Sequence, residues 1–212
     1  LTIDRQQICE HITEGFFPAV SLTPKMGAYT PEPKLSFDPE KARALLAEAG
    51  FPDGDGFPVF SLMIARPSAR AAAEALQAMW KQHLNIRVNI QNRDWGSYVS
   101  AQQSLNFDMA SAGWIGDYLD PTTFLNMWTA GNGNNNTGWS DPRYEALLRE
   151  AALKADPAER LALFQQAEAT LMDALPILPI SHYTRNYLLR PEVKGWHPVL
   201  LDNHSWKVIH LE

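Results

Sequence analysis

Basic charge and cysteine are both scarce in this 212-residue sequence, and each shortage removes classes of function. The formal net charge is -6 at pH 7, which argues against a nucleic-acid partner because phosphate binding needs a basic face. No basic amphipathic run is present that would suit a membrane surface. Cys9 is the only cysteine, so a disulfide framework and a thiolate metal cluster are excluded. We interpret Cys9, which lies at helical spacing beside Ile8 and Ile12, as a small core residue.

Signatures of common enzymes and metal sites are missing as well. The six histidines show no H-E-x-x-H or comparable ligand spacing, and no G-x-S-x-G elbow exists. Asp117 and Asp120 are close in sequence, but paired glycosidase carboxylates usually face each other across a cleft of about 5 to 9.5 Å. Calcium needs about six to eight oxygen ligands, which the apolar neighbours Trp114 and Ile115 do not supply. We therefore expect no enzymatic activity, no metal and no cofactor.

The composition is that of an ordinary globular domain. Hydrophobic residues make up 45% and charged residues 20% of the chain, and 212 residues are enough to bury a full core. One domain, with a possible tail, is therefore expected. Leu1 opens directly into a helix start, without the charged and apolar regions of a signal peptide.

Asp-Pro pairs mark the predicted helix starts. The pair occurs at 38–39, 120–121, 141–142 and 156–157, each time before a helical pattern. Aspartate caps a helix N-terminus and proline suits the first helical position, so four helices are predicted to begin there. The first of these helices is expected to bury Ala42, Leu45, Leu46 and Ala49.

Three apolar segments are predicted to form strands of one sheet. Residues 57–64 are almost wholly apolar, residues 86–90 alternate, and residues from 107 onward are small and apolar. Helical patterns at about 68–84 and from about 94 separate these segments. The order strand, helix, strand, helix, strand predicts an α/β fold with a largely parallel central sheet flanked by helices.

The sequence also predicts the backbone structure of three segments outside this sheet. The proline-rich residues 16–37 are expected to form an extended connection over the surface. Residues 177–183 and 185–190 are both predicted to be strands.

The stretch 107–121 combines a strand end with recognition chemistry. Ligands of open α/β sheets collect outside the carboxyl ends of the strands. Trp114 offers a large apolar surface there, Asp117 offers a carboxylate that would hold a terminal ammonium, and Tyr118 lies beside them. The alternative is that Asp117 is only a turn residue, as aspartates between a strand and a helix usually are.

The backbone of this stretch is a second candidate feature. Glycine allows close approach of another chain, so the N–H and C=O groups around Gly113 and Ile115 are expected to pair with an extended guest. Arg66, Trp95 and Trp114 each follow a predicted strand, so a parallel sheet would bring them to one edge. Core packing is the alternative for every aromatic residue, and we adopt it for two tryptophans at helical spacing, Trp80 and Trp128.

Four segments resemble one known family, in the same order along the chain. Leu1–Ile8, Phe37–Ala42, Ala112–Pro121 and Asn134–Trp139 are similar to segments of the oligopeptide- and dipeptide-binding proteins of ABC importers, which form bacterial extracellular solute-binding protein family 5. The resemblance implies a periplasmic-binding-protein-like lobe in residues 1–186, equivalent to the C-terminal lobe alone. It also implies that residues 187–212 return to an N-terminal lobe that this sequence lacks.

The same resemblance implies a binding protein rather than an enzyme. Short peptides would be captured in an extended form and delivered to a membrane permease, in the periplasm or otherwise outside the cytoplasm. Asp117 matches the aspartate that receives the peptide N-terminus in the family. Trp95 and Trp114 match tryptophans that line its side-chain pockets.

One departure from the family leaves peptide length open. Several members carry a basic residue before the Gly-Trp pair that meets the carboxylate of a short peptide, whereas residues 109–112 here contain none. Arg66 and Arg70 are candidates for that role, because a helix start favours an anion; the alternative is that both are solvated surface residues. Two other functions stay open, namely an α/β hydrolase fragment with its catalytic partner in missing sequence, and a family member that binds nickel, haem or a sugar-like ligand.

Overall fold

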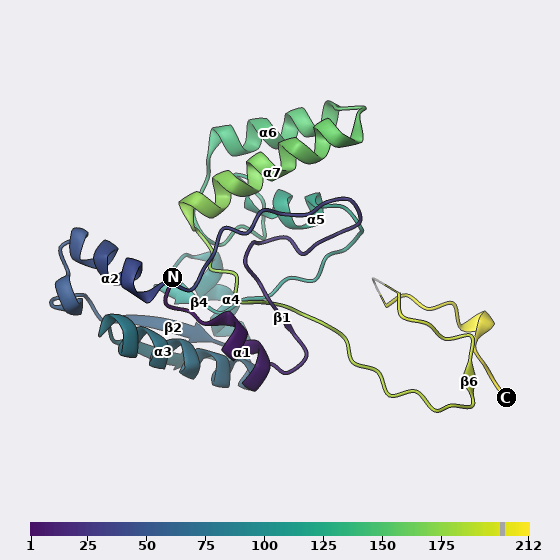
Figure 1. The fold of residues 1–212 in the computed structure, drawn as a ribbon, viewed down its shortest axis with the longest axis horizontal. Helices are drawn as coiled ribbons and strands as arrows, with labels where there is room; N and C mark the ends of the chain where they lie inside the picture. Colours follow the sequence, from purple (N-terminus) through teal and green to yellow (C-terminus); the bar gives the residue numbers. More distant parts are fainter. Residues whose placement is uncertain (200–201) are drawn as a thin grey trace.

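A parallel sheet of three strands organises the larger part of the molecule, for which the computed structural model describes residues 1–199 and 202–212. The middle strand is β2 (Phe60–Ile64), with β3 (Val88–Asn92) on one side and β4 (Met109–Ala110) on the other (Figure 1). The connection from β2 to β3 contains α3 (Arg70–Leu84), and the connection from β3 to β4 contains α4 (Trp95–Gln103). The predicted α/β fold with a parallel sheet flanked by helices is confirmed.

Side chains of β2 alternate between two buried cores. Leu62 and Ile64 pack in a cluster with Trp80 of α3, whereas Met63 packs with Tyr98 of α4. This division follows from the two-residue repeat of a strand. Helix α1 (Arg5–His11) contributes to the same cluster as α3. Cys9, Trp80 and Trp128, which were each interpreted as core residues from the sequence, are buried.

A second core lies among three later helices, drawn above the sheet in Figure 1. These helices are α5 (Thr122–Leu125), α6 (Pro142–Leu153) and α7 (Pro157–Ala174), and the last two run alongside each other. Tyr144 of α6 and Phe164 of α7 are fully buried between them. Within the described parts of the chain, no helix is both long enough and apolar enough to cross a membrane. In the residues that the structure describes, four short 3-10 turns complete the helical elements: Pro52–Gly54, Pro67–Ala69, Asn126–Trp128 and Trp206–Val208.

Three of the four Asp-Pro pairs start helices as predicted. Asp38, Asp141 and Asp156 each accept hydrogen bonds from backbone N–H groups of the first turn, and a proline follows each of them inside the helix. The fourth prediction was wrong in its details. The N-cap of α5 is Pro121, and Asp120 binds an arginine of α7 in addition to the first turn of α5.

Helix α2 (Pro39–Glu48) is far less buried than predicted. None of its residues is fully buried, Leu45 is 47% exposed, and Ala49 just after it is also exposed. Only Leu46 reaches the core on the α3 side, where it is partly buried. The helix lies at the margin of the molecule, with α3 covering one side of it (Figure 1). Its apolar pattern was therefore misread as a fully covered face.

The connection 16–37 is partly buried instead of lying over the surface. Thr23 and Tyr29 have almost no exposed surface. Both donate to the buried carboxylate of Glu168 in α7, the Thr23 N–H at 2.8 Å and the Tyr29 hydroxyl at 2.5 Å. A buried acceptor on α7 thus draws the connection into the helical core, because a buried carboxylate requires donors.

The two predicted late strands are mostly absent. In 177–183 only Ser181–His182 (β5) forms a strand, which pairs antiparallel with β1 (Phe17–Pro18), and residues 185–190 contain no strand. Pro179 lies just before β5 and has no N–H to give to a ladder. Its carbonyl instead accepts a hydrogen bond of 2.8 Å from the side chain of Arg5.

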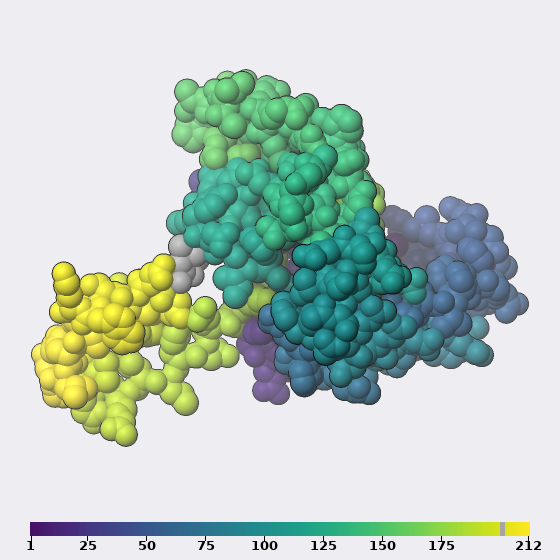
Figure 2. Space-filling model, turned by 180° about the vertical axis from the view of Figure 1, so that it is seen from behind, coloured from purple at the N-terminus to yellow at the C-terminus, as the bar shows by residue number. Residues whose placement is uncertain are grey.

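The described residues of the tail, 187–199 and 202–212, project away from the rest of the molecule (Figure 2). Within this tail, β6 (Val193–Lys194) and β7 (His210–Leu211) pair antiparallel. Tyr187 packs against Trp196 with ring centroids 4.6 Å apart. Large apolar side chains of the tail are nevertheless exposed, namely Leu188, Leu189, Trp206, Val208 and Leu211.

Candidate ligand-binding site

The segment that follows β4 has a free backbone. Ser111 still belongs to the sheet, since its N–H donates to the carbonyl of Met63 at 2.8 Å, and its own carbonyl accepts the hydroxyl of Tyr98 at 2.5 Å. Beyond it, residues 112–116 make no backbone hydrogen bond to any described residue. Because β4 is an edge strand, these N–H and C=O groups form an open edge that an extended chain can join.

Asp117 stands at the end of this open edge. Its backbone N–H donates to the hydroxyl of Thr123 at 2.9 Å. No described residue donates a hydrogen bond to its carboxylate, and the side chain is exposed. Ile115 and Tyr118 beside it are exposed as well, Ile115 by 68%. The arrangement presents an acceptor without a donor among apolar side chains.

Trp114 is fixed at its polar end. The indole Nε1 donates to the carbonyl of Thr123 at 2.9 Å, and the residue is half-buried. Trp114 thus shares an anchor with Asp117. The rest of the residue is in part exposed to solvent.

Trp95 and Arg66 come together at the carboxyl ends of β3 and β2. The guanidinium of Arg66 lies 5.5 Å from the centroid of the Trp95 ring. That ring is stacked on Tyr98, with centroids 5.6 Å apart and 58% of Trp95 still exposed. Burial raises the pKa of the Tyr98 hydroxyl, and the positive charge of Arg66 acts against that rise. Two strand ends therefore contribute a cation and an aromatic surface to one region.

Arg70 has a different environment. Its Nε donates to the Glu74 carboxylate at 2.9 Å, four residues along α3, and both side chains are exposed. Such i,i+4 pairs stabilise the helix that carries them. Arg70 is therefore already paired within its own helix, while Arg66 contacts an aromatic ring.

Two features of the site escaped the sequence interpretation. Tyr183 lies directly against Gly113, because a Cβ at position 113 would collide with its hydroxyl, and its ring packs on Phe16 at 5.0 Å. The second feature is the pairing of Asp120 with Arg160, which joins the segment to α7. The sequence predicted a buried strand at residues 177–183 and a helix cap at Asp120, and neither prediction implies a contact with the site or with α7.

The ion pair of Asp120 and Arg160 is bidentate. Nη1 of Arg160 lies 2.7 Å from Oδ2 of Asp120, and Nη2 lies 3.0 Å from Oδ1. Partial burial alone would raise the pKa of the Asp120 carboxyl, but hydrogen bonds from Arg160 and Thr122 outweigh it and hold the pKa below its usual value. Asp120 is therefore a charged structural anchor, while Asp117 is the free carboxylate.

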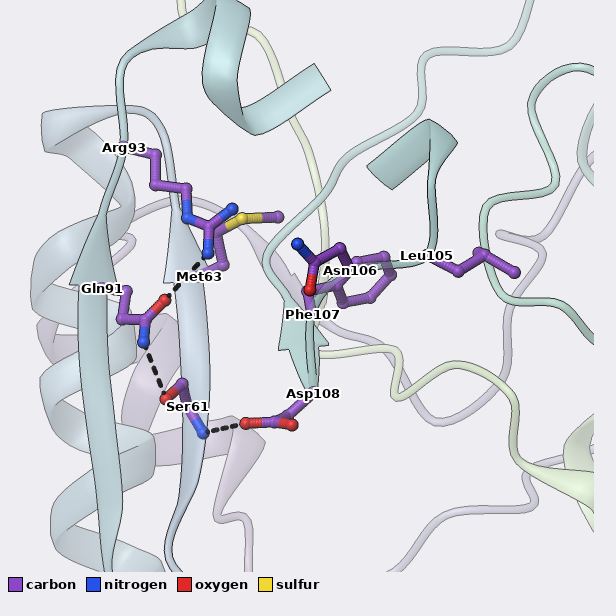
Figure 3. A pocket seen from close by; sticks show the side chains of 8 residues that line it. All are labelled: Ser61, Met63, Gln91, Arg93, Leu105, Asn106, Phe107 and Asp108. Carbon is purple, nitrogen blue, oxygen red and sulfur yellow. Dashed lines mark hydrogen bonds between the residues drawn. The ribbon is translucent and has the colours of Figure 1, made fainter. Parts of the chain in front are cut away.

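A polar hollow of about 370 Å³ lies elsewhere on the sheet, on the face opposite to α3 (Figure 3). Asp108 accepts the backbone N–H of Ser61, Ser61 accepts the amide of Gln91, and Gln91 accepts a bond from Arg93. None of the predicted site residues lines this hollow. Within the described residues, no group of three or more histidine, cysteine or acidic side chains is arranged to hold a metal ion.

Comparison with known proteins identifies the family. Residues 1–136 match the model of the bacterial extracellular solute-binding proteins, family 5. The chain is 33% identical to the periplasmic murein peptide-binding protein MppA of Escherichia coli, over 92% of this chain and 38% of that protein. It is 30% identical to the oligopeptide-binding protein OppA of Bacillus subtilis, with the same two coverages.

The fold is found in solved structures of the same kind. A crystal structure of a periplasmic oligopeptide-binding protein from Borrelia burgdorferi superposes with a TM-score of 0.87 at 31% identity, and the match covers 100% of this chain and 43% of that one. The chain therefore spans about two fifths of the length of the proteins that it matches. Together with the family match, these likenesses show that the chain belongs to the bacterial extracellular solute-binding proteins of family 5.

Proposed function

We propose that residues 1–186 form one wall of a peptide-binding cleft in an extracytoplasmic solute-binding protein, which captures short peptides and delivers them to an ABC permease. The observation that carries the proposal is the open backbone of residues 112–116, which ends at the free carboxylate of Asp117. Relatives named as oligopeptide- and murein peptide-binding proteins support peptides as the ligand class.

An extended peptide would be held mainly through its own backbone. The unpaired groups around Gly113 and Ile115 offer donors and acceptors to an added strand, in the way that edge strands bind peptides. Main-chain pairing makes no demand on side chains. We therefore expect broad tolerance for peptide sequence, with Trp95, Ile115 and Tyr118 acting as wide apolar walls.

The peptide N-terminus would bind at Asp117. A free ammonium has three N–H donors, and the Asp117 carboxylate receives none from the described part of the chain. A charge-assisted hydrogen bond of this kind is stronger than a neutral one. The polarity of the peptide would thereby be fixed, with its first residue beside Trp114.

The peptide carboxylate would bind near Arg66 when the peptide is short. Residues 109–112 lack the basic residue that several family members carry just before the Gly-Trp pair, and Arg66 is the predicted cation that lies against Trp95. Arg70 is a matched control, because it is exposed and paired with Glu74. Replacement of Arg66 by glutamine should abolish any preference for a free over an amidated C-terminus, while Arg70→Gln should leave that preference unchanged.

A second lobe would complete the cleft and cover the tail. The exposed apolar residues of the tail, including Leu188, Trp206 and Leu211, require a partner surface. The chain spans about 38% of MppA, which leaves room for such a lobe in a longer protein. In our proposal residues 187–212 pack on that lobe, and closure of the two lobes shields the peptide from water.

One experiment separates binding from hydrolysis. The two-lobed protein would be mixed with alanine peptides of two to five residues, with heat release followed by calorimetry and the peptides recovered for mass analysis after long incubation. Saturable binding with intact peptide is the expected result. Cleaved peptide would favour the α/β hydrolase, and binding of nickel, haem or a sugar in the absence of any peptide signal would favour another ligand class.

A further inference from the structure

Thr123 joins the two predicted ligand residues through different atoms. Its hydroxyl oxygen accepts the backbone N–H of Asp117 at 2.9 Å, and its carbonyl oxygen accepts the indole Nε1 of Trp114 at 2.9 Å. Thr123 itself is only 4% exposed. The places of both ligand residues therefore depend on where the first turn of α5 stands.

Asp120 holds that first turn. Its carbonyl accepts the N–H of Thr123 at 3.1 Å, and its Oδ1 accepts the N–H of Thr122 at 3.1 Å and the Thr122 hydroxyl at 2.7 Å. Helix α5 is very short, so these bonds at its start are a large part of what fixes it. A change in the Asp120 carboxylate would be passed directly to Thr123.

Arg160 ties Asp120 to the helical core. Both Nη atoms bind the Asp120 carboxylate, and the guanidinium carbon lies 4.6 Å from the ring centroid of Phe164, which is fully buried. A planar guanidinium that is bidentate and stacked has little freedom to move. Arg149 of α6 provides a comparison, because it makes one exposed contact of 3.4 Å with Glu145 and has neither a bidentate pairing nor an aromatic partner in the described residues.

We infer that Arg160 is a positioning residue, which acts through Asp120 and Thr123 to set Asp117 and Trp114 for the ligand. Arg160 does not touch the ligand in this scheme. The inference rests on the proposed function, because it takes Asp117 as the acceptor of the peptide ammonium. Its consequence is that residues of α7 govern how well the site distinguishes a charged from an uncharged peptide N-terminus.

The test measures a ratio of two affinities in the two-lobed protein. The dissociation constant for N-acetylated trialanine is divided by that for free trialanine, so that only the ammonium contact is isolated. Thr123→Val keeps the shape and the carbonyl but removes the acceptor for the Asp117 N–H, and the ratio should fall about two- to tenfold, as for the loss of one hydrogen bond. Thr123→Ser retains the hydroxyl and should restore the ratio.

The ion pair is tested in the same way. Asp120→Asn and Arg160→Gln should each lower the ratio by a similar factor, and the double variant should lower it no further, because both changes remove one interaction. Arg149→Gln is the control and should leave the ratio unchanged. Arg160→Lys keeps the positive charge but cannot make the bidentate contact, so its ratio should lie between those of the wild type and Arg160→Gln. This variant replaces Arg160→Gln in the test if Arg160→Gln does not fold.

Two outcomes would overturn the inference, and they differ. A wild-type ratio near one would refute the proposed role of Asp117 and this inference with it. A high wild-type ratio that Thr123→Val and Arg160→Gln both retain, even with lowered melting temperatures, would refute this inference alone. In that case the pair of Asp120 and Arg160 stabilises the fold without positioning the site.

Discussion

Replacement of Asp117 by alanine should weaken peptide binding strongly in a closed two-lobed protein. The carboxylate is exposed in this lobe, and the adjoining Trp114 and Ile115 are apolar. An exposed charge pair contributes about 0 to 1 kcal/mol. Closure would exclude water from the same pair, and the loss of one partner from a desolvated charge pair costs about 2 to 5 kcal/mol. The expected loss of affinity is therefore about 30-fold to several thousand-fold.

The assay is calorimetry on four combinations of protein and peptide. Wild-type protein and the Asp117→Ala variant are each titrated with free and with N-acetylated trialanine. Acetylation removes the charge from the peptide side, so it should cost about as much as the substitution. The two changes should not add, since both delete the same interaction. Equal affinity of the wild-type protein for the two peptides would mean that Asp117 is a turn residue.

Three further predictions address the backbone, the buried carboxylate and the second lobe. Gly113→Val should lower the affinity for all peptides by a similar factor, because its side chain would collide with Tyr183 and so displace the backbone of the open edge, whereas Gly133→Ala, which has open space around it, should have no effect. A loss confined to one class of peptide would point to side-chain recognition. Burial raises the pKa of Glu168 despite opposing hydrogen bonds, so its stabilising contribution is full below the unfolded pKa of about 4.3 and is lost as the pH rises through the folded value. The stability of Glu168→Gln relative to wild type, measured by urea unfolding, should accordingly increase between pH 4 and pH 7, and a constant difference would contradict this account. Residues 1–212 alone should bind trialanine in the millimolar range or weaker, which corresponds to about 4 kcal/mol; micromolar affinity in calorimetry would argue against a two-lobed cleft.

The sheet was predictable because its signals are local. Residues 57–64 and 86–90 are flanked by clear helical patterns, and the order of these elements dictates parallel strands. Helix α4 begins directly after Asp94, whose side chain accepts the N–H of Ser97 as a capping residue should. Short-range rules of this kind need no knowledge of distant contacts.

Burial was harder to predict because it depends on layers that a sequence does not display. Leu45 has the spacing of an inward residue but is 47% exposed, since α2 lies at the edge of the molecule. Tyr29 lies in a proline-rich connection but is buried, because Glu168 is its acceptor 139 positions later in the chain. In both cases the deciding contact, or its absence, is far away in sequence.

The residues of the candidate site were also only partly predictable from the sequence. Asp117, Trp114 and the glycine at 113 were singled out from the strand-to-helix pattern, and the structure places them along one open edge. Tyr183 lies against Gly113 but was not predicted to belong to the site, because the two residues are 70 positions apart in the sequence. A sequence pattern identifies the segment that carries a site more readily than the side chains that complete it.

The fourth Asp-Pro pair carries the most instructive departure from local rules. Asp38, Asp141 and Asp156 cap their helices, and each is followed by a helix of ten residues or more. Asp120 precedes a helix of four residues, and its carboxylate is bound by Arg160 from another element. Sequences tend to break local rules at functional positions, where the structure is stabilised from elsewhere. In the scheme inferred above, the aspartate of this Asp-Pro pair therefore anchors the Asp117 segment to α7 through Arg160. The anchor is needed because a helix of one turn could not fix that segment alone.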